Sequence, residues 1–175
     1  LVDLARGHED FRYPGSHRLL DFQPELDVLH LHNLHGRYFD LRALPALARG
    51  RPTLITLHDE WTYTGHCAGT LECMRWQTGC GACPHLDVTP RLLRDGTARN
   101  WAGKRALWEA TRIAVAAPSR WLLERATASI LAPAITSAMA SIEGTGSLLT
   151  ADSRDRINRK MTSRNSLGGR SAWMM

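Results

Sequence analysis

Short apolar stretches recur along the first two thirds of the chain, and each is closed by polar or turn-forming residues. Residues 27–32 (D-V-L-H-L-H), 53–57 (T-L-I-T-L) and 113–117 (I-A-V-A-A) have the alternating or β-branched character of strands. Between and after them, apolar residues recur at helical spacing. The pattern therefore predicts strands that alternate with helices.

Three helices are expected because apolar residues recur every three or four positions beside residues that can cap a helix. The first follows Asp40 and stops at Gly50, the second covers residues 97–111, and the third follows Ser119. Strand–helix alternation of this kind is typical of an α/β fold with a parallel sheet covered by helices on both faces. We therefore expect a partial Rossmann-like parallel sheet with flanking helices.

The domain organisation follows from where this alternation holds. Residues 1–135 are expected to form one domain. Within it, residues 60–96 are irregular and hold every cysteine, so they are expected to be a Cys-rich insertion with a function or a bound ion. Residues 136–175 diverge from this pattern, and from Glu143 onward they are rich in Ser, Arg, Gly and Thr, which predicts a disordered tail.

Composition agrees with one soluble domain. The chain has 175 residues, of which 43% are hydrophobic and 22% charged, enough for one core but not for two full domains. Residues 122–139, the most apolar stretch, contain charged residues and a proline, so they are not expected to cross a membrane. The absence of a visible secretory signal leads us to expect a cytoplasmic location.

The positive charge is concentrated at one end of the chain. The formal net charge is +5, of which residues 151–175 carry +4 and residues 1–150 carry +1. A nearly neutral body does not form the basic face that binding to phosphate backbones requires. No nucleic-acid partner is expected.

Polar side chains gather where the expected strands end. They are His30, His32, Asn33 and His35 after the first strand, His58 and Asp59 after the second, and Ser119 after the third. Ligands of open parallel sheets bind beyond the carboxyl ends of the strands. The sequence therefore predicts a site for a polyhydroxylated ligand at this edge, with His58 as its strongest candidate.

These residues also have purely structural interpretations. One of His30 and His32 could be a packed core histidine, because both lie on one face of a strand. Asp59 could be a turn carboxylate, and Ser119 could serve as a helix cap rather than as a ligand contact. Both interpretations remain open at this point.

The four cysteines, Cys67, Cys73, Cys80 and Cys83, lie within 17 residues. Cys80-x-x-Cys83 matches the chelating half of a structural zinc site, and the other two thiolates would complete a tetrahedral centre, although their five-residue gap is wider than usual. His66 and His85 are alternative ligands. Two disulfides or unliganded thiols are the alternatives to zinc. A catalytic thiol–disulfide role is not expected, because C-G-A-C does not stand between a strand and a helix.

Common catalytic signatures are absent from the chain. It has no G-x-G-x-x-G, no G-x-x-x-x-G-K-[ST], no H-E-x-x-H, no G-x-S-x-G and no D-x-D pair. The residues alone therefore define a Rossmann-like sheet with a polar edge and a Cys-rich insertion.

Four sequence blocks carry a family resemblance. They are D-V-L-H-L-H-N-L-H-G-R-Y-F-D-L-R-A-L-P, T-L-I-T-L-H-D-E-W-T-Y-T-G-H-C-A, C-M-R-W-Q-T-G-C-G-A-C-P and A-A-P-S-R-W-L. Their joint spacing resembles the acceptor-side half of bacterial family 4 glycosyltransferases of the GT-B type, in particular the exopolysaccharide and colanic-acid type sugar transferases. The resemblance covers residues 7–135.

The resemblance implies a two-domain enzyme that moves a sugar from a nucleotide-sugar donor to a glycan or lipid-linked acceptor. It also implies a cytoplasmic enzyme, with peripheral contact at the inner face of the membrane. On this resemblance His58 and Asp59 hold the catalytic position facing the interdomain cleft. Asn33, His35 and Gly36 would line the same cleft, and Ser119 would bind substrate.

The chain departs from the family pattern in three places. It lacks the glycine-rich first strand-turn-helix before Gly7, the P-N-G-V-D hinge after Ile135, and the donor domain with its E-x7-E pair. The expectation is therefore a fragment without the donor half, inactive alone. Two hypotheses from other classes stand beside it: a non-catalytic carbohydrate-binding remnant and a zinc-stapled interaction module. No oligomeric state is predicted.

Overall fold

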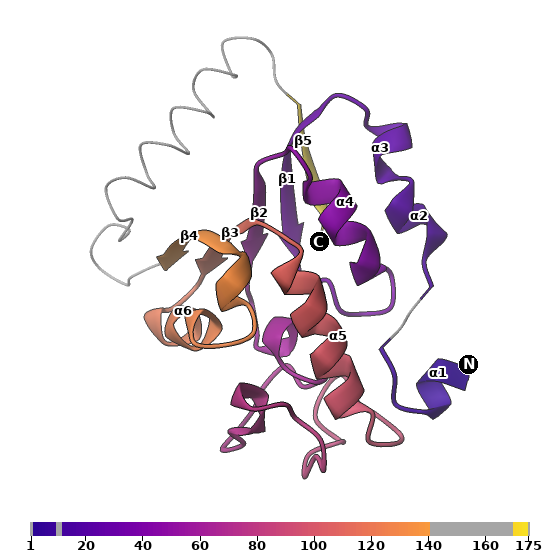
Figure 1. Cartoon of the computed structure of the whole chain (residues 1–175), viewed down its shortest axis with the longest axis vertical. Helices are drawn as coiled ribbons and strands as arrows, with labels where there is room; N and C mark the ends of the chain where they lie inside the picture. The colour runs from indigo at the N-terminus through magenta and orange to yellow at the C-terminus, as the bar shows by residue number, and fades with distance from the viewer. Residues whose placement is uncertain (1, 10–11, 141–169, 175) are drawn as a thin grey trace.

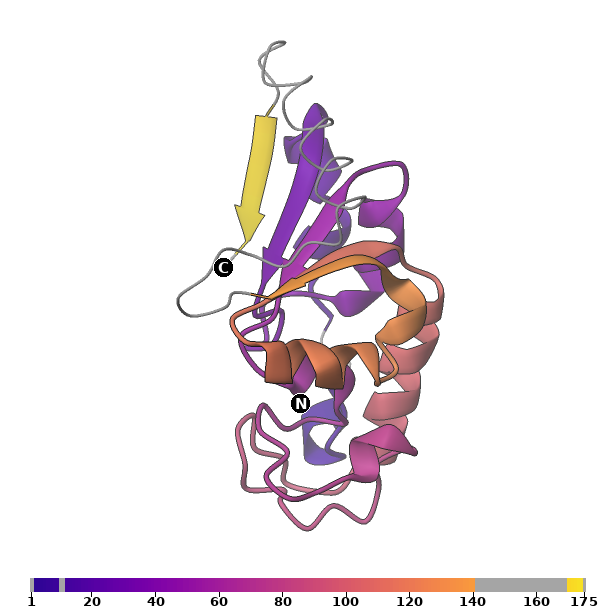
Figure 2. The same cartoon turned by 90° about the vertical axis from the view of Figure 1, so that its left-hand side faces the viewer.

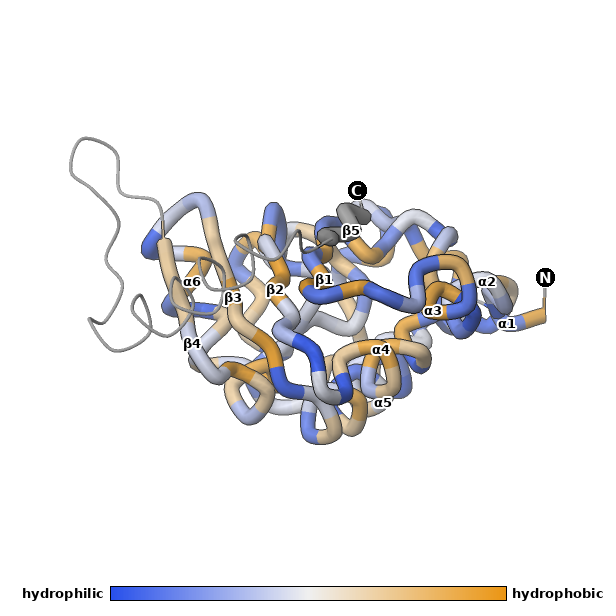
Figure 3. Tube along the Cα trace, turned by 90° about the horizontal axis from the view of Figure 1, so that it is seen from above, coloured by the Kyte–Doolittle hydropathy of each residue, from blue (hydrophilic) through white to orange (hydrophobic). Residues whose placement is uncertain are grey.

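The computed structural model of the chain describes residues 2–9, 12–140 and 170–174. Five strands form one sheet in the order β4-β3-β2-β1-β5, and every neighbouring pair is parallel (Figure 3). The strands are β1 (Leu26–His32), β2 (Thr53–Thr56), β3 (Ile113–Ala117), β4 (Ile135–Ala140) and β5 (Arg170–Met174). The predicted α/β fold with a parallel sheet and flanking helices is confirmed.

The helices connect and flank these strands (Figure 1). They are α1 (Val2–Ala5), α2 (Pro14–His17), α3 (Leu19–Phe22), α4 (Leu44–Ala48), α5 (Thr97–Glu109) and α6 (Arg120–Thr127). Short 3-10 turns are η1 (Leu41–Ala43), η2 (Trp61–Tyr63), η3 (Arg75–Gln77) and η4 (Ala132–Ala134). The predicted capping role of Asp40 is confirmed, because its Oδ1 accepts the backbone N–H of Arg42 at 3.0 Å.

The core lies on one face of the sheet. From β1 to β4, strands that follow each other in the chain are neighbours in space, so successive right-handed crossovers place their helices on the same side. Figure 2 shows α4 and α5 on one side of the sheet. The buried strand residues Leu29, Leu31, Ile55 and Val115 form one hydrophobic cluster with Trp108 of α5.

The expected helical cover on both faces is therefore wrong for the helices that the structure describes. The strand order from β1 to β4 never reverses, so no crossover turns to the opposite face. Residues on that face are half-buried, whereas their neighbours under the helices are buried. The half-buried side of the sheet includes His30, His32 and Thr56, two of which belong to the site described below.

The Cys-rich insertion has little regular structure, as expected. Between β2 and α5 it contains the short turns η2 and η3. Two tryptophans of α5 hold it in place, because Trp101 Nε1 donates to the carbonyl of Trp76 at 2.7 Å and Trp108 Nε1 donates to that of Thr62 at 3.0 Å. The insertion is thus anchored on a helix rather than on the sheet.

Parts of the expected tail form strands. Residues 136–140 belong to β4, and residues 170–174 form β5 beside β1. The prediction of a disordered tail is therefore wrong for these ten residues, because their backbones pair with β3 and β1. The rest of the segment from Glu143 onward, for which disorder was predicted, lies outside the described residues.

None of the helices in the described ranges combines the length and the apolar character needed to cross a bilayer.

Candidate functional site

Four histidines and one aspartate lie in the carboxyl-terminal part of β1 and in the turns that follow β1 and β2. We call this group the histidine edge: His30, His32, His35, His58 and Asp59. Alternation along β1 puts His30 and His32 on the half-buried face. His32 Nδ1 lies 2.8 Å from Nε2 of His58, and His30 Nε2 lies 2.8 Å from Oγ1 of Thr56. The sheet thus brings together imidazoles that are 26 residues apart in the chain.

Burial and mutual proximity keep two of these histidines uncharged. Burial, followed by the nearby rings of His32 and His58, lowers the pKa of His30 below its usual 6.5. Burial, followed by His58, lowers the pKa of His32 in the same direction. Both rings are therefore neutral at neutral pH, so the His32–His58 hydrogen bond joins one donor nitrogen to one acceptor nitrogen.

Asp59 forms the second interacting pair of the histidine edge. Its Oδ2 lies 2.8 Å from Nε2 of His35, and its Oδ1 accepts the backbone N–H of Trp61 at 2.9 Å. The ring of His35 also lies against the indole of Trp61, with 5.5 Å between centroids. Asp59 is therefore a turn carboxylate that also contacts His35, and its functional role stays a prediction.

The turn after β1 borders the histidine edge. Asn33 and Arg37 adopt the left-handed backbone conformation, with φ of 37° and 63°, and Gly36 has φ of 107°. The hydroxyl of Tyr38 donates to the carbonyl oxygens of His32 at 3.1 Å and Asn33 at 2.9 Å, which holds the turn against the strand. Asn33 and Gly36 are exposed beside the histidines.

Ser119 has the structural role that the sequence offered as an alternative. Its Oγ accepts the backbone N–H of Leu122 at 3.2 Å, so it caps α6. Because β3 runs parallel to β2, Ser119 lies at the same edge of the sheet as His58. Within the described residues, no hydrogen bond joins it to the histidine edge.

A buried layer supports the histidine edge, and the sequence did not reveal it. Lys104 Nζ lies 2.9 Å from Oε2 of Glu9, with the two side chains 3% and 7% exposed. Lys104 also stands 3.6 Å from the ring centroid of Trp61 and donates to the carbonyl of Trp61 at 2.8 Å. Trp61 Nε1 in turn donates to Oε1 of Glu9 at 2.7 Å. This layer fixes Trp61, whose backbone N–H donates to Asp59.

A second buried ion pair holds the start of the insertion. Arg125 Nε donates to Oε1 of Glu60 at 2.6 Å, and the backbone N–H of Thr70 donates to Oε2 at 2.7 Å. The hydroxyl of Tyr63 donates to the same Glu60 carboxylate at 3.0 Å. In the sequence, the run H-D-E-W-T-Y at residues 58–63 marks this region by its charged and aromatic residues. The sequence does not tell which of these charges is buried.

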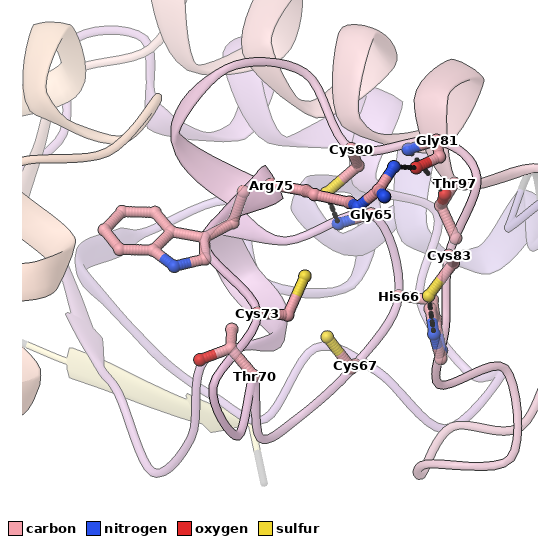
Figure 4. Close-up of a pocket in the computed structure, with 11 residues that line it drawn as sticks. Gly65, His66, Cys67, Thr70, Cys73, Arg75, Cys80, Gly81, Cys83 and Thr97 are labelled. Atoms are coloured by element: carbon pink, nitrogen blue, oxygen red, sulfur yellow. Dashed lines mark hydrogen bonds between the residues drawn. The ribbon is translucent and has the colours of Figure 1, made fainter.

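The four cysteines line one pocket, shown in Figure 4. All four are free and half-buried. In residues 2–9, 12–140 and 170–174, no group of three or more His, Cys, Asp and Glu side chains has the arrangement of a metal centre. His66 also lines the pocket, whereas His85 does not.

Burial disfavours the thiolate form of three of these cysteines. It raises the pKa of Cys67 and of Cys80 to about 11, and it raises the pKa of Cys83 as well. Thiols that stay protonated at neutral pH are poor nucleophiles. A nucleophilic role of Cys67, Cys80 or Cys83 is therefore disfavoured.

Sequence comparison finds a relative among glycosyl transferases. Over 88 residues the chain is 40% identical to WcaC of Escherichia coli (strain K12), whose name gives it, provisionally, as a colanic acid biosynthesis glycosyl transferase. The match covers 46% of this chain and 22% of the relative. No family model and no solved structure matches the chain. The glycosyltransferase relationship expected from the sequence blocks is supported, and the assignment to family 4 and GT-B stays a prediction.

Proposed function

We propose that this chain is the acceptor-side part of a glycosyltransferase of the GT-B type, family 4, and that the histidine edge receives the acceptor sugar. The observation that carries the proposal is the pairing of His32 with His58 and of His35 with Asp59 at the carboxyl edge of a parallel sheet. The similarity to a named glycosyl transferase over 88 residues supports it.

Sugar transfer needs groups that orient hydroxyls and take up a proton as the acceptor oxygen attacks. His58 is exposed, and its contact with His32 fixes the ring orientation. Asp59 is held by His35 and by the N–H of Trp61, so its carboxylate keeps one direction. In the turn after β1, Asn33 adds an amide group and Gly36 adds an accessible backbone. In this proposal, His58 and Asp59 are the catalytic residues.

The wider reaction is part of the same proposal. A nucleotide-sugar donor would bind to a second domain, and the acceptor would be a glycan or a lipid-linked sugar in exopolysaccharide synthesis. A lipid-linked acceptor would bring the enzyme into peripheral contact with the inner face of the membrane, in the cytoplasm. The acceptor half then supplies orientation, whereas stabilisation of the departing diphosphate falls to the donor domain.

Acceptor binding by the full chain tests the proposal. Isothermal titration with colanic-acid oligosaccharides should detect binding, and His58→Ala and Asp59→Asn should each weaken it by about tenfold or more, because hydrogen bonds to the sugar are lost. His85→Ala is the matched control, since this histidine lies outside the histidine edge, and it should bind as the wild type does.

The outcomes separate the hypotheses. A folded wild-type chain that binds no oligosaccharide would contradict the proposed acceptor role, and equal binding by His58→Ala would remove the site from the histidine edge. Release of nucleoside diphosphate from UDP- or GDP-sugars in the presence of the acceptor would show transfer. Glycan binding without that release, even when a donor domain is supplied, would favour a carbohydrate-binding module.

A further inference from the structure

The pocket in the Cys-rich insertion has the size and the lining of a single-ion site. Its volume is about 20 Å³, which is room for one water molecule or one ion. In Figure 4, the sulfur atoms of the four cysteines point into the same space between the loops. The cysteines come from three separate parts of the insertion, so the pocket joins segments that share no secondary structure.

The backbone around Cys80 is bent into an unusual turn. Gly79, Cys80, Gly81 and Ala82 all have positive φ, at 145°, 53°, 88° and 45°. Non-glycine residues in this region are strained, and such strain persists where the surroundings fix the loop, as at ligand sites. The turn is anchored, because Arg75 donates to the carbonyl of Gly81 at 2.9 Å. It directs both Cys80 and Cys83 to the pocket.

Burial disfavours free thiolates in this pocket, but an N–H donor and a cationic side chain stand next to it. The backbone N–H of Gly65 donates to Sγ of Cys80 at 3.3 Å. Arg75 lines the pocket as well. A zinc ion with four thiolates carries a net charge of −2, which nearby cations and N–H groups stabilise.

His66 is a neighbour of this sulfur cluster. Its Nδ1 lies 2.8 Å from the carbonyl oxygen of Pro90, which can only accept, so Nδ1 is the donor of this hydrogen bond. Its Nε2 then faces Sγ of Cys83 at 3.6 Å. This contact restricts the side chain of Cys83 from outside the cluster.

We propose that Cys67, Cys73, Cys80 and Cys83 bind one Zn²⁺ as a structural staple of the Cys-rich insertion, with His66 outside the ligand set. On binding, each thiol exchanges its S–H bond for a Zn–S bond, and the four protons pass to solvent. The thiols as they stand do not have the arrangement of a metal centre, so in this proposal their side chains rotate about the Cα–Cβ bonds on binding. The staple replaces the secondary structure that the insertion lacks and does not depend on the proposed function.

Metal analysis of the full chain tests this site. The chain is produced in zinc-supplemented medium without chelators, and zinc is quantified by inductively coupled plasma mass spectrometry. One zinc per chain is expected, released in step with the modification of four thiols by a mercurial reagent. Cys80→Ser and Cys83→Ser should each lose most of the zinc, whereas the control His85→Ala and also His66→Gln should retain it.

A second measurement on the wild-type chain covers variants that fail to fold. Titration of the metal-free chain with Co²⁺ should give thiolate charge-transfer absorption and the visible bands of a tetrahedral four-sulfur site. Zinc should also raise the thermal midpoint by on the order of 10 °C. A folded chain that holds no zinc and shows no cobalt–thiolate absorption, or a mass that reports two disulfides, would overturn the proposal. Loss of zinc in His66→Gln would overturn the all-thiolate ligand set.

Discussion

The hydrogen bond between His32 and His58 links the charge of the histidine edge to its geometry. Two imidazoles share a hydrogen bond when one nitrogen donates and the other accepts, so protonation of both rings places two donors face to face. Burial and His58 lower the pKa of His32, and burial is also the main cause of the lowered pKa of His30. Acidification therefore acts against the folded arrangement of this edge.

The first prediction concerns this acid sensitivity. The folded-state pKa values of His30 and His32 lie below the unfolded value of 6.5, so the unfolded chain binds more protons below pH 6.5. The stabilisation is complete above that pH and is lost as the pH falls below it. Urea unfolding from about pH 7.5 to about pH 5.0 measures the effect. His32→Gln should reduce the slope of stability against pH, and His85→Ala should preserve it.

A wild-type slope of stability against pH in His32→Gln would show that this histidine titrates alike in the folded and unfolded states.

Sequence reasoning identified the residues of the histidine edge because they follow strands whose carboxyl ends must meet. It could not identify their partners. The contact of His35 with Asp59 and that of His32 with His58 depend on register between β1 and β2, which an alternating pattern does not encode.

Among the elements, α6 shows how one residue can satisfy a structural role at a candidate site. Ser119 caps this helix through its hydroxyl oxygen, which accepts the N–H of Leu122. Helix α6 packs against β3 and β4, and its residues Leu122 and Ala126 are buried. Loss of the cap should therefore loosen the crossover between β3 and β4.

The second prediction separates capping from ligand binding at this position. Ser119→Ala should lower the free energy of unfolding by about 1 kcal/mol, whereas Ser119→Asp should retain most of the stability, because aspartate is also a good cap. Thermal or urea unfolding measures both. Oligosaccharide affinity at the histidine edge should stay near the wild-type value in Ser119→Ala. A large loss of affinity without a loss of stability would assign Ser119 to the substrate instead.

The strands differ in how well their sequences reveal them. β1, β2 and β3 are rich in leucine, isoleucine and valine, and their positions were predicted to within one residue. β4 reads I-T-S-A-M-A and has small or polar residues at most positions. Its strand conformation comes from pairing with β3 rather than from local preference, so tertiary context decided what the pattern could not.

At the scale of the whole molecule, a buried ion pair ties the N-terminal segment to α5. The Cβ that a side chain would add at Gly7 would collide with the carbonyl of Arg94, so only glycine allows this close approach. Asn100 Nδ2 donates to the carbonyl of Gly7 at 2.9 Å. Lys104 and Glu9 then pair at 2.9 Å below the surface.

The third prediction tests this tie. Lys104→Met should lower the free energy of unfolding by about 3–5 kcal/mol, because the Glu9 carboxylate is left buried without its cation. The double variant Lys104→Met/Glu9→Gln should recover a large part of that loss. The control is Arg105→Met, which breaks an exposed pair with Glu109 and should change stability by less than about 1 kcal/mol.

Urea unfolding of the wild type, Lys104→Met, Glu9→Gln and the double variant completes a double-mutant cycle. A loss in the double variant that equals the sum of the two single losses would show that the two side chains do not depend on each other. Such a result would also separate the N-terminal segment from the support of Trp61 and Asp59.

The uninterrupted strand order from β1 to β4 bears on how the protein is made. As the chain leaves the ribosome, each of β2, β3 and β4 finds its partner already synthesised and adjacent, so the sheet can grow in one direction without waiting for distant segments. The long excursion between β2 and β3 delays one step, but the entropy of closing a loop rises slowly with its length. This half of the molecule can therefore assemble vectorially during translation.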